Sequence, residues 1–163
     1  MQPSPRLYHI CLATLAALPL TVTAKGGLGE AFAAMLRKAT GQLAPDSLSN
    51  PKKVEDILRQ VAAEVNPTMP VSVDKDTRLE KIVPGPGAKF TYNYTIVTRK
   101  SKEIDHAYLM NFLRKNVKAE ACSNADLKIF FENKVTVGYS YKSSDGIHIG
   151  TLDVKPRDCG YAA

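Results

Sequence analysis

Few side chains in this 163-residue sequence could carry out chemistry, and those that could are far apart. Two of the three histidines, His106 and His148, could act as a general base for a serine or cysteine nucleophile, because an imidazole titrates near neutral pH. No strand–turn–helix nucleophile motif accompanies either of them. We therefore interpret both as ordinary surface or half-buried residues, and the sequence predicts no catalytic residue.

Two acidic residues, Asp74 and Asp76, are the other candidates for chemistry. In an extended segment their carboxylates would lie on one face, where a pair can bind a cation or share acid–base work. Two oxygen donors are too few for calcium, and the glycine that an EF-hand loop requires is missing. A turn in which aspartate accepts backbone hydrogen bonds is the favoured alternative. The sequence therefore predicts no metal and no cofactor.

A proline- and glycine-rich tetrapeptide is the best candidate for recognition. Gly85 and Gly87 do not belong to a phosphate-binding loop, because no Gly-x-x-x-x-Gly-Lys-Ser/Thr motif occurs. Pro84 and Pro86 would stiffen an exposed hairpin tip that a partner could recognise, although a plain connection between strands is the alternative. Together with Arg78 on the preceding strand, this tip is our hypothesis for a surface that binds a protein or an envelope component.

The N-terminus has the pattern of a secretory signal peptide. Arg6 and His9 precede an apolar run at residues 10–20, and Val22–Ala24 places small residues at the cleavage positions. The alternative, a membrane anchor, is disfavoured because the run is about half of the ~20 residues that a spanning helix needs. We expect residues 1–24 to be removed and the mature protein to be periplasmic or secreted.

The remaining residues, 25–163, have the length of one domain with its own core. No later segment is apolar enough to cross a bilayer. The formal net charge of +6 is spread along the chain, with one local concentration of basic residues. Its members are Arg99, Lys100, Lys102, Arg114, Lys115 and Lys118. They could meet an acidic partner or anionic lipid, but the solvated face of a helix is favoured, and export argues against nucleic acid.

Residues 25–163 contain two cysteines, Cys122 and Cys159. In an exported protein an even pair favours a disulfide over the alternatives, a metal-binding pair or a reactive thiol. No Cys-x-x-Cys motif occurs, and no histidine is close to either cysteine in the sequence. Closing a loop of about 37 residues would stabilise the fold by on the order of 3–4 kcal/mol, less any strain.

Apolar periodicity predicts four helices. The clearest one follows Asn50 as its N-cap and Pro51 at its first position, and it stops before Pro67. An earlier helix is expected over residues 28–41, a third from about Lys102, and a short fourth after a capping box at Ser123. The apolar residues of the earliest helix are Leu28, Phe32, Met35, Leu36 and Ala39.

Alternating apolar residues predict two β-hairpins, over residues 77–98 and 135–154. The first has the proline-glycine tip and an irregular first arm, in which we expect a bulge. The second turns at Asp145-Gly146. The predicted fold class is therefore α+β: a four-stranded antiparallel sheet from two hairpins, in the order α-α-β-β-α-α-β-β, with helices packed on one face.

Four tyrosines fall on the apolar side of these predicted strands: Tyr92, Tyr94, Tyr139 and Tyr141. Large aromatic side chains on one sheet face could line a ligand groove, but packing in the core is the favoured interpretation. We therefore expect the two hairpins to share a tyrosine-rich inner face that helices cover.

Several of these motifs resemble those of a family of small exported bacterial proteins. The similar stretches are Asn66-Pro67-x-x-Pro70, Val73-Asp74-x-x-Thr77-Arg78-Leu79, Gly85-Pro86-Gly87, Phe90-Thr91-Tyr92-x-Tyr94-Thr95, Val135-Thr136-Val137-x-Tyr139-x-Tyr141 and Asp158-Cys159. The family includes a quorum-sensing-regulated virulence factor of Pseudomonas. The resemblance spans roughly residues 66–160 and implies a periplasmic or secreted α+β domain with a disulfide. It implies no particular activity.

The sequence thus favours an exported, non-enzymatic binding or accessory protein of the bacterial cell envelope. Two alternatives stay open at this point. One is an inhibitor of an envelope enzyme such as a lysozyme or a protease, which would require a rigid protruding loop. The other is a hydrolase whose site is assembled from residues distant in the sequence, which would require a histidine within hydrogen-bond reach of a partner side chain.

Overall fold

The computed structural model describes residues 50–162. The predicted signal peptide, residues 1–24, and the helix expected over residues 28–41 lie outside the described residues. The described helices are α2 (Pro51–Val65), α3 (His106–Ser123) and α4 (Ala125–Glu132), with short 3-10 turns η3 (Asn66–Thr68), η4 (Ser101–Glu103) and η5 (Pro156–Cys159). The strands are β1 (Val71–Ser72), β2 (Thr77–Gly85), β3 (Lys89–Ile96), β4 (Thr136–Ser143) and β5 (His148–Val154).

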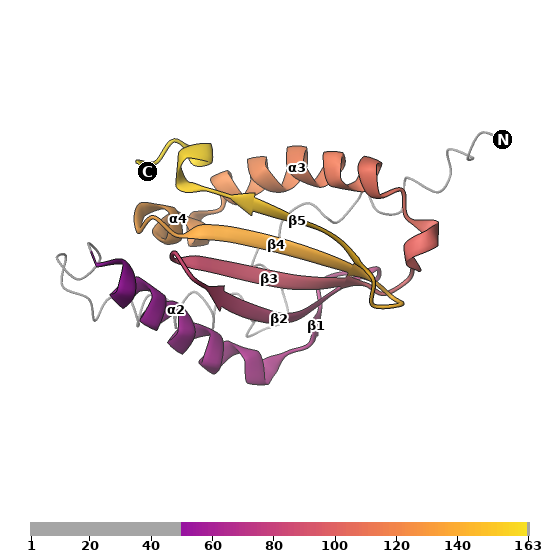
Figure 1. Ribbon diagram of the computed structural model, residues 1–163, viewed down its shortest axis with the longest axis horizontal. Coiled ribbons are helices and arrows are strands. Elements are labelled where there is room, and N and C mark those ends of the chain that lie inside the picture. The colour runs from indigo at the N-terminus through magenta and orange to yellow at the C-terminus, as the bar shows by residue number, and fades with distance from the viewer. Residues whose placement is uncertain (1–49, 163) are drawn as a thin grey trace.

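The sheet has five strands in the order β1-β2-β3-β4-β5, and it is mixed (Figure 1). The prediction of four antiparallel strands is therefore wrong in two respects. The two-residue strand β1 adds to the edge, and β3 runs parallel to β4. The reason for the second error is the connection between the hairpins: α3 and α4 form a helical crossover, which returns the chain so that β4 runs in the same direction as β3.

Strand β2 carries the irregularity that the sequence predicted. The register shifts between Leu79 and Lys81, so that Glu80 is the extra residue of a bulge. Beyond the end of β1, the side chain of Asn66 pairs with the backbone of β2 as a neighbouring strand would. Its amide N–H donates to the carbonyl of Ile82 and its amide oxygen accepts from the Ile82 N–H, both at 2.8 Å. This pairing satisfies part of an exposed sheet edge.

The helix boundaries follow from their capping residues. Helix α2 begins as predicted, with the Asn50 side chain accepting from Lys52 N and proline in the first turn. Helix α3 begins at His106 rather than near Lys102, because η4 precedes it and Asp105 is its N-cap. Helix α4 is capped by Asn124 rather than by a box at Ser123. Short polar side chains at these positions satisfy N–H groups that have no partner within the helix.

Each helix covers a different part of the sheet. Helix α2 packs along β2, α3 along β5, and α4 on the beginning of β4, so α2 and α3 lie toward opposite edges of the sheet (Figure 1). The fully buried side chains Phe90, Leu113 and Val137 come from a strand, a helix and another strand and belong to one core. The predicted α+β class, with helices packed on a sheet, is confirmed.

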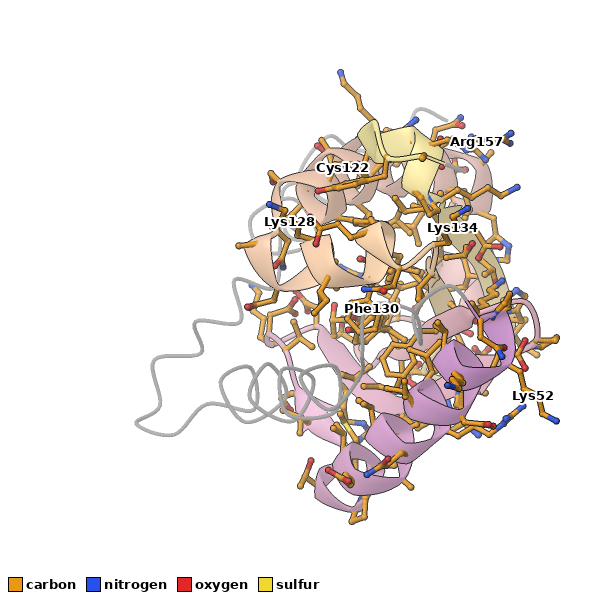
Figure 2. All side chains as sticks on the ribbon, turned by 90° about the vertical axis from the view of Figure 1, so that its left-hand side faces the viewer. Lys52, Cys122, Lys128, Phe130, Lys134 and Arg157 are labelled. Atoms are coloured by element: carbon orange, nitrogen blue, oxygen red, sulfur yellow. A yellow bond between two sulfur atoms is a disulfide. The ribbon has the colours of Figure 1, made fainter. Side chains whose placement is uncertain are left out.

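The Cys122–Cys159 disulfide is present, as predicted, with the two Cα atoms 5.0 Å apart. It links the end of α3 to η5, and Figure 2 shows Cys122 beside that C-terminal turn. A salt bridge of 3.1 Å between Lys118 and Asp158 joins the same two elements. The ring of Tyr161 also stacks on Phe131 of α4, with centroids 5.8 Å apart. The C-terminal segment is thus fixed to both helices of the crossover.

Candidate partner-binding surfaces

The predicted tip, Pro84–Gly87, connects β2 and β3 and is held in place by α2. Pro86 and Gly87 are exposed, and Gly87 adopts a left-handed conformation, with φ of +71°. Its N–H donates to Oε1 of Glu55 at 2.8 Å, a contact between residues 32 apart in the sequence. Glycine reaches this conformation without steric cost, and the hydrogen bond limits the tip's freedom to move. Pro86 and Gly87 are therefore open to solvent, and the tip is held by this chain itself before any partner binds.

Arg78 lies near the other end of β2, so the structure does not bring it to the tip. Seven residues of extended chain separate Arg78 from Gly85, which corresponds to about 23 Å. The Arg78 guanidinium donates to Oε1 of Glu80 through Nε at 3.0 Å and through Nη2 at 2.9 Å. A partner that contacts both the tip and Arg78 must therefore extend along most of β2.

Glu80 is the centre of a small polar network at this end of β2. Desolvation raises the pKa of its carboxyl, but the hydrogen bonds from Thr95 and Arg78, together with the Arg78 and Lys142 charges, outweigh that effect. The net result is a pKa of Glu80 below its ordinary value. Arg78 is thus already engaged with a carboxylate inside this chain, although its side chain stays 44% exposed.

Basic side chains from distant segments lie at the same end of the molecule as the tip (Figure 2). The register places Lys89 beside Thr136, and Val137 beside Val154, so the tip is at the same end of the sheet as the start of β4 and the end of β5. Figure 2 shows Lys52, Lys128, Lys134 and Arg157 at this end. Lys128 pairs with Glu132 at 3.6 Å. Among the described residues, no salt bridge joins Lys52, Lys134 or Arg157 to an acidic group.

The sequence did not predict that Glu55 and these basic residues lie at the same end of the molecule as the tip. Glu55 is on α2 and the basic residues come from α2, from α4, from the turn that follows it and from η5. No motif connects these positions, because their proximity depends on the sheet order. The one sequence signal was the glutamate on the polar side of a strongly amphipathic helix, which is usually a solvated position.

The structure places the two histidines on the surface and the two aspartates in a turn. His106 is the first residue of α3 and His148 the first of β5; both are exposed, and neither imidazole is hydrogen-bonded to a described residue. Oδ1 of Asp74 accepts from the N–H groups of Asp76 at 2.7 Å and Thr77 at 2.8 Å, which is the predicted aspartate turn. Within residues 50–162, no three potential metal-binding side chains form a cluster.

Asp76 is an acidic residue with a buried side chain. Its carboxylate is buried, and Oδ1 accepts from Oγ1 of Thr98 at 2.9 Å. Within the described part of the chain, Oδ2 has no hydrogen-bond partner. The Asp76 carbonyl accepts from Val97 N at 2.8 Å, so this residue ties the start of β2 to the end of β3. Its contacts are those of a structural residue in a turn.

The four predicted tyrosines form a stacked ladder on the core side of β3 and β4. Parallel pairing sets Tyr92 beside Tyr139 and Tyr94 beside Tyr141, with ring centroids 5.8 Å and 5.2 Å apart. All four are between 3% and 8% exposed. Burial, and to a smaller extent neighbouring negative groups, raise the pKa of each phenol above its ordinary value. The prediction that these rings pack inside the protein is confirmed.

None of the described helices is sufficiently long and hydrophobic to span a bilayer. No protein-family model matches this chain, and no curated protein sequence is significantly similar to it. Solved structures do match. A protein of Pseudomonas aeruginosa described as secreted is 16% identical, with a TM-score of 0.55, over 67% of this chain and 95% of its own.

Two pilotins of type II secretion systems match to a similar extent. EpsS of Vibrio vulnificus is 12% identical with a TM-score of 0.53, and AspS of Vibrio cholerae is 10% identical with a TM-score of 0.51. Each alignment covers 67% of this chain and 94% of the pilotin. At such low identity the likeness concerns the fold. The chain therefore has a fold like those of a secreted Pseudomonas protein and of secretion-system pilotins.

Proposed function

We propose that this protein is an exported, non-enzymatic accessory protein of the bacterial cell envelope that binds a protein partner. The observation that carries the proposal is the Pro84–Gly87 tip, in which Pro86 and Gly87 are exposed and the Gly87 N–H is held by Glu55 of α2. A surface that is ordered before binding loses less conformational entropy when it binds. The basic side chains at the same end of the molecule would favour a partner with an acidic surface.

The similar folds support this class of function and suggest a sharper form of it. Pilotins act in type II secretion systems, and the other match is described as a secreted protein. We propose that the partner is a component of an envelope assembly, with a secretion system as the first candidate. The predicted signal peptide would deliver residues 25–163 to the periplasm, where such components are accessible, or to the outside of the cell.

Photo-crosslinking in the native cell tests this proposal. We would introduce p-benzoylphenylalanine at position 86 in the tip and, as a control, at the exposed position 151 on β5. We expect a crosslinked protein from position 86 and none from position 151. Mass spectrometry of the crosslinked band would identify the partner and show whether it belongs to a secretion system.

A pair of glutamate substitutions on α2 provides the matched control. Glu55→Gln weakens the acceptor that holds the tip, whereas Glu64→Gln changes an exposed glutamate of the same helix that binds Gln60. With the probe at position 86, Glu55→Gln should reduce the crosslink, and Glu64→Gln should leave it unchanged. Equal crosslinking in all variants, or the same band from positions 86 and 151, would contradict a specific tip contact.

The same experiment separates accessory binding from enzyme inhibition, because a rigid tip also suits an inhibitor. An inhibitor should crosslink to a lysozyme or a protease and block that enzyme at an equimolar ratio in a mixing assay. A hydrolase receives no support from the two histidines, whose imidazoles have no hydrogen-bonded partner among the described residues. A secretion component in the crosslinked band would favour the accessory role over inhibition.

A further inference from the structure

Helix α3 packs on strand β5 at a glycine (Figure 1). A Cβ atom built on Gly150, the third residue of β5, would lie 2.5 Å from Sδ of Met110 and 2.9 Å from its Cε. Heavy atoms that are not bonded to each other pack at about 3.5–4.0 Å. The thioether of Met110, on α3, therefore occupies the space that a side chain at position 150 would take.

This arrangement makes Met110 a neighbour of the tyrosine ladder. Gly150 is the cross-strand partner of Tyr141, and side chains at paired positions have Cβ atoms about 4.5–5.5 Å apart. Because Gly150 has no side chain, the Met110 thioether stands beside the Tyr141 side chain in its place, and a thioether next to an aromatic ring is a favourable contact. Met110 thus contributes to the cover of the ladder at the end away from Phe90 and α4.

The two ends of α3 are attached in different ways. At its C-terminal end, the disulfide and the salt bridge between Lys118 and Asp158 fasten it to η5. Ahead of its first turn, Ser101 of η4 donates to the exposed carboxylate of Asp145, through its N–H at 3.0 Å and through Oγ at 2.9 Å. Water can replace hydrogen bonds to an exposed carboxylate at little cost. The first turns of α3, which include Met110, therefore depend most on their packing against β5.

Met110 is also accessible to an oxidant. Its side chain is half-buried, so part of its surface stays in contact with solvent. Peroxides convert a methionine thioether to a sulfoxide, which is polar and larger by one oxygen atom. A sulfoxide between Gly150 and Tyr141 is disfavoured twice, because the space is already filled and because the contact would bury a polar oxygen. Oxidised Met110 should therefore turn its head group toward water and leave Gly150 uncovered.

We propose that Met110 is an oxidation-sensitive contact between α3 and β5. Hydrogen peroxide transfers one oxygen atom to Sδ: the O–O bond breaks, the S–O bond of the sulfoxide forms, and the second oxygen leaves as water. Sulfur loses two electrons in this step and the peroxide gains them. The first turns of α3 then loosen from β5, and the Tyr141 end of the ladder becomes accessible. This proposal is independent of the role of the Pro84–Gly87 tip, because the two regions share no residue.

Peroxide treatment of two variants of the full exported protein tests the proposal. The methionines of residues 25–163 are Met35, Met69 and Met110. Met35→Leu combined with Met69→Leu keeps Met110 alone, whereas Met110→Leu removes it and keeps the other two. In the first variant we expect peptide mass spectrometry to find the added oxygen on Met110, and the midpoint of thermal unfolding to fall by about 5 °C. Acrylamide should also quench the tyrosine fluorescence more strongly, a signal that is directly observable because the chain has no tryptophan.

The Met110→Leu variant should show neither response, because leucine fills a similar volume and has no sulfur to oxidise. Circular dichroism before treatment shows that each variant is folded. The proposal is wrong if oxidation of Met110 leaves the unfolding midpoint and the quenching unchanged, or if Met110→Leu responds to the same degree. Resistance of Met110 to peroxide in the folded protein would overturn it as well.

A pair of glycine substitutions gives a second measurement that needs no oxidant. Gly150→Ala adds a methyl group where the end of the Met110 side chain lies, so the untreated protein should already show stronger quenching by acrylamide. Gly138→Ala adds the same group on β4, where it would meet Thr91 and Lys89 on the side of the sheet opposite the tyrosines, and should leave the quenching unchanged. Equal quenching in two folded variants would overturn the proposal, and if Gly150→Ala does not fold, the peroxide comparison decides.

Discussion

The two faces of the sheet are stabilised in different ways, although they are built by alternating residues of the same strands. On the covered face, Tyr92 and Tyr139 are paired neighbours and bury neutral rings. On the open face, the next pair in register is Asn93 and Ser140, which are only half-buried. Because side chains alternate along a strand, a single residue step separates the two environments.

On the open face, the side chains are held by hydrogen bonds and salt bridges between charged groups that are partly accessible to solvent. Glu80 accepts from Arg78 and Thr95, and Lys89 is paired with Asp153 at 2.8 Å. Exposed ion pairs contribute little to stability, typically below about 1 kcal/mol, whereas burying a large ring contributes several times more. The comparison teaches that stability is concentrated on the tyrosine face, so that the open face is freer to vary or to bind.

The largest predicted difference between the faces is the response to alkaline pH. Burial raises the pKa of Tyr92, Tyr94, Tyr139 and Tyr141 in the folded state, so folding favours their protonated form. This contribution is fully present below the unfolded pKa of about 10 and is lost as the pH rises above it toward the folded values. We expect the four phenols to lose their protons only as the protein unfolds.

Absorbance at 295 nm, recorded beside circular dichroism during a pH titration, checks this expectation. The two transitions should coincide for the ladder, because the phenols become accessible only when the sheet opens. Ionisation of all tyrosines near pH 10, in a protein whose circular dichroism is unchanged, would mean that the ladder is in contact with solvent.

A core truncation should have the next largest effect. Phe90 is fully buried and stacks on Phe130, so Phe90→Ala removes a ring at the junction of the sheet and α4. We expect a loss of about 3–5 kcal/mol in the free energy of unfolding, from lost burial and the cavity left behind. Urea denaturation followed by circular dichroism measures it.

The control for Phe90→Ala is a truncation on the open face of the same strand. Asn93→Ala removes a half-buried polar side chain whose amide donates to the Thr91 carbonyl at 3.3 Å. Its effect should remain within about 0.5 kcal/mol, as is usual for surface substitutions. Similar losses in both variants would remove the distinction between the two faces.

Local patterns predicted most of the elements on both faces. Helix α2 was predictable because the Asn50 cap, the proline at its first position and a regular apolar stripe are close together in the sequence. The alternation in β3 and β4 predicted which tyrosines would be inside. The disulfide followed from the number of cysteines and the expected export. Each of these inferences needed only residues that are close together in the sequence, or the number of cysteines.

The parallel pairing of β3 with β4 was not predictable in this way. Each hairpin is antiparallel within itself, but the direction in which the two hairpins meet depends on the path of α3 and α4. The two-residue strand β1 is too short to show a period. Tyr108 has the spacing of a buried residue of α3 and is 47% exposed, because α3 packs along the side of the sheet and only part of its circumference is covered.

The candidate binding surface was predictable only in its local part. The sequence of the tip indicated a turn, and the structure has one. The glutamate that holds it and the basic residues at the same end of the molecule come from other elements, and Arg78 is at the far end of the strand. Contacts between residues 30 or more positions apart leave no periodic signal, so they could not be read before the sheet order was known.

The smallest predicted effect concerns the charged network of the open face. Replacing Glu80 by glutamine removes the charge that Arg78 and Thr95 stabilise, and should cost on the order of 1 kcal/mol because the Arg78 side chain of the pair remains accessible to water. The pKa of Glu80 is lowered in the folded state, so its contribution is present above the ordinary value of 4.5 and disappears as the pH falls through the folded value.

Urea denaturation of Glu80→Gln and the wild type at several pH values tests this sign. The two free energies of unfolding should differ above about pH 5 and converge in more acidic solution, whereas high salt should reduce the difference. Glu132→Gln, at an exposed helical pair with Lys128, is the control for a solvated ion pair. A difference between wild type and Glu80→Gln that grows toward low pH would show that desolvation, rather than the Arg78 and Thr95 hydrogen bonds, dominates this carboxylate.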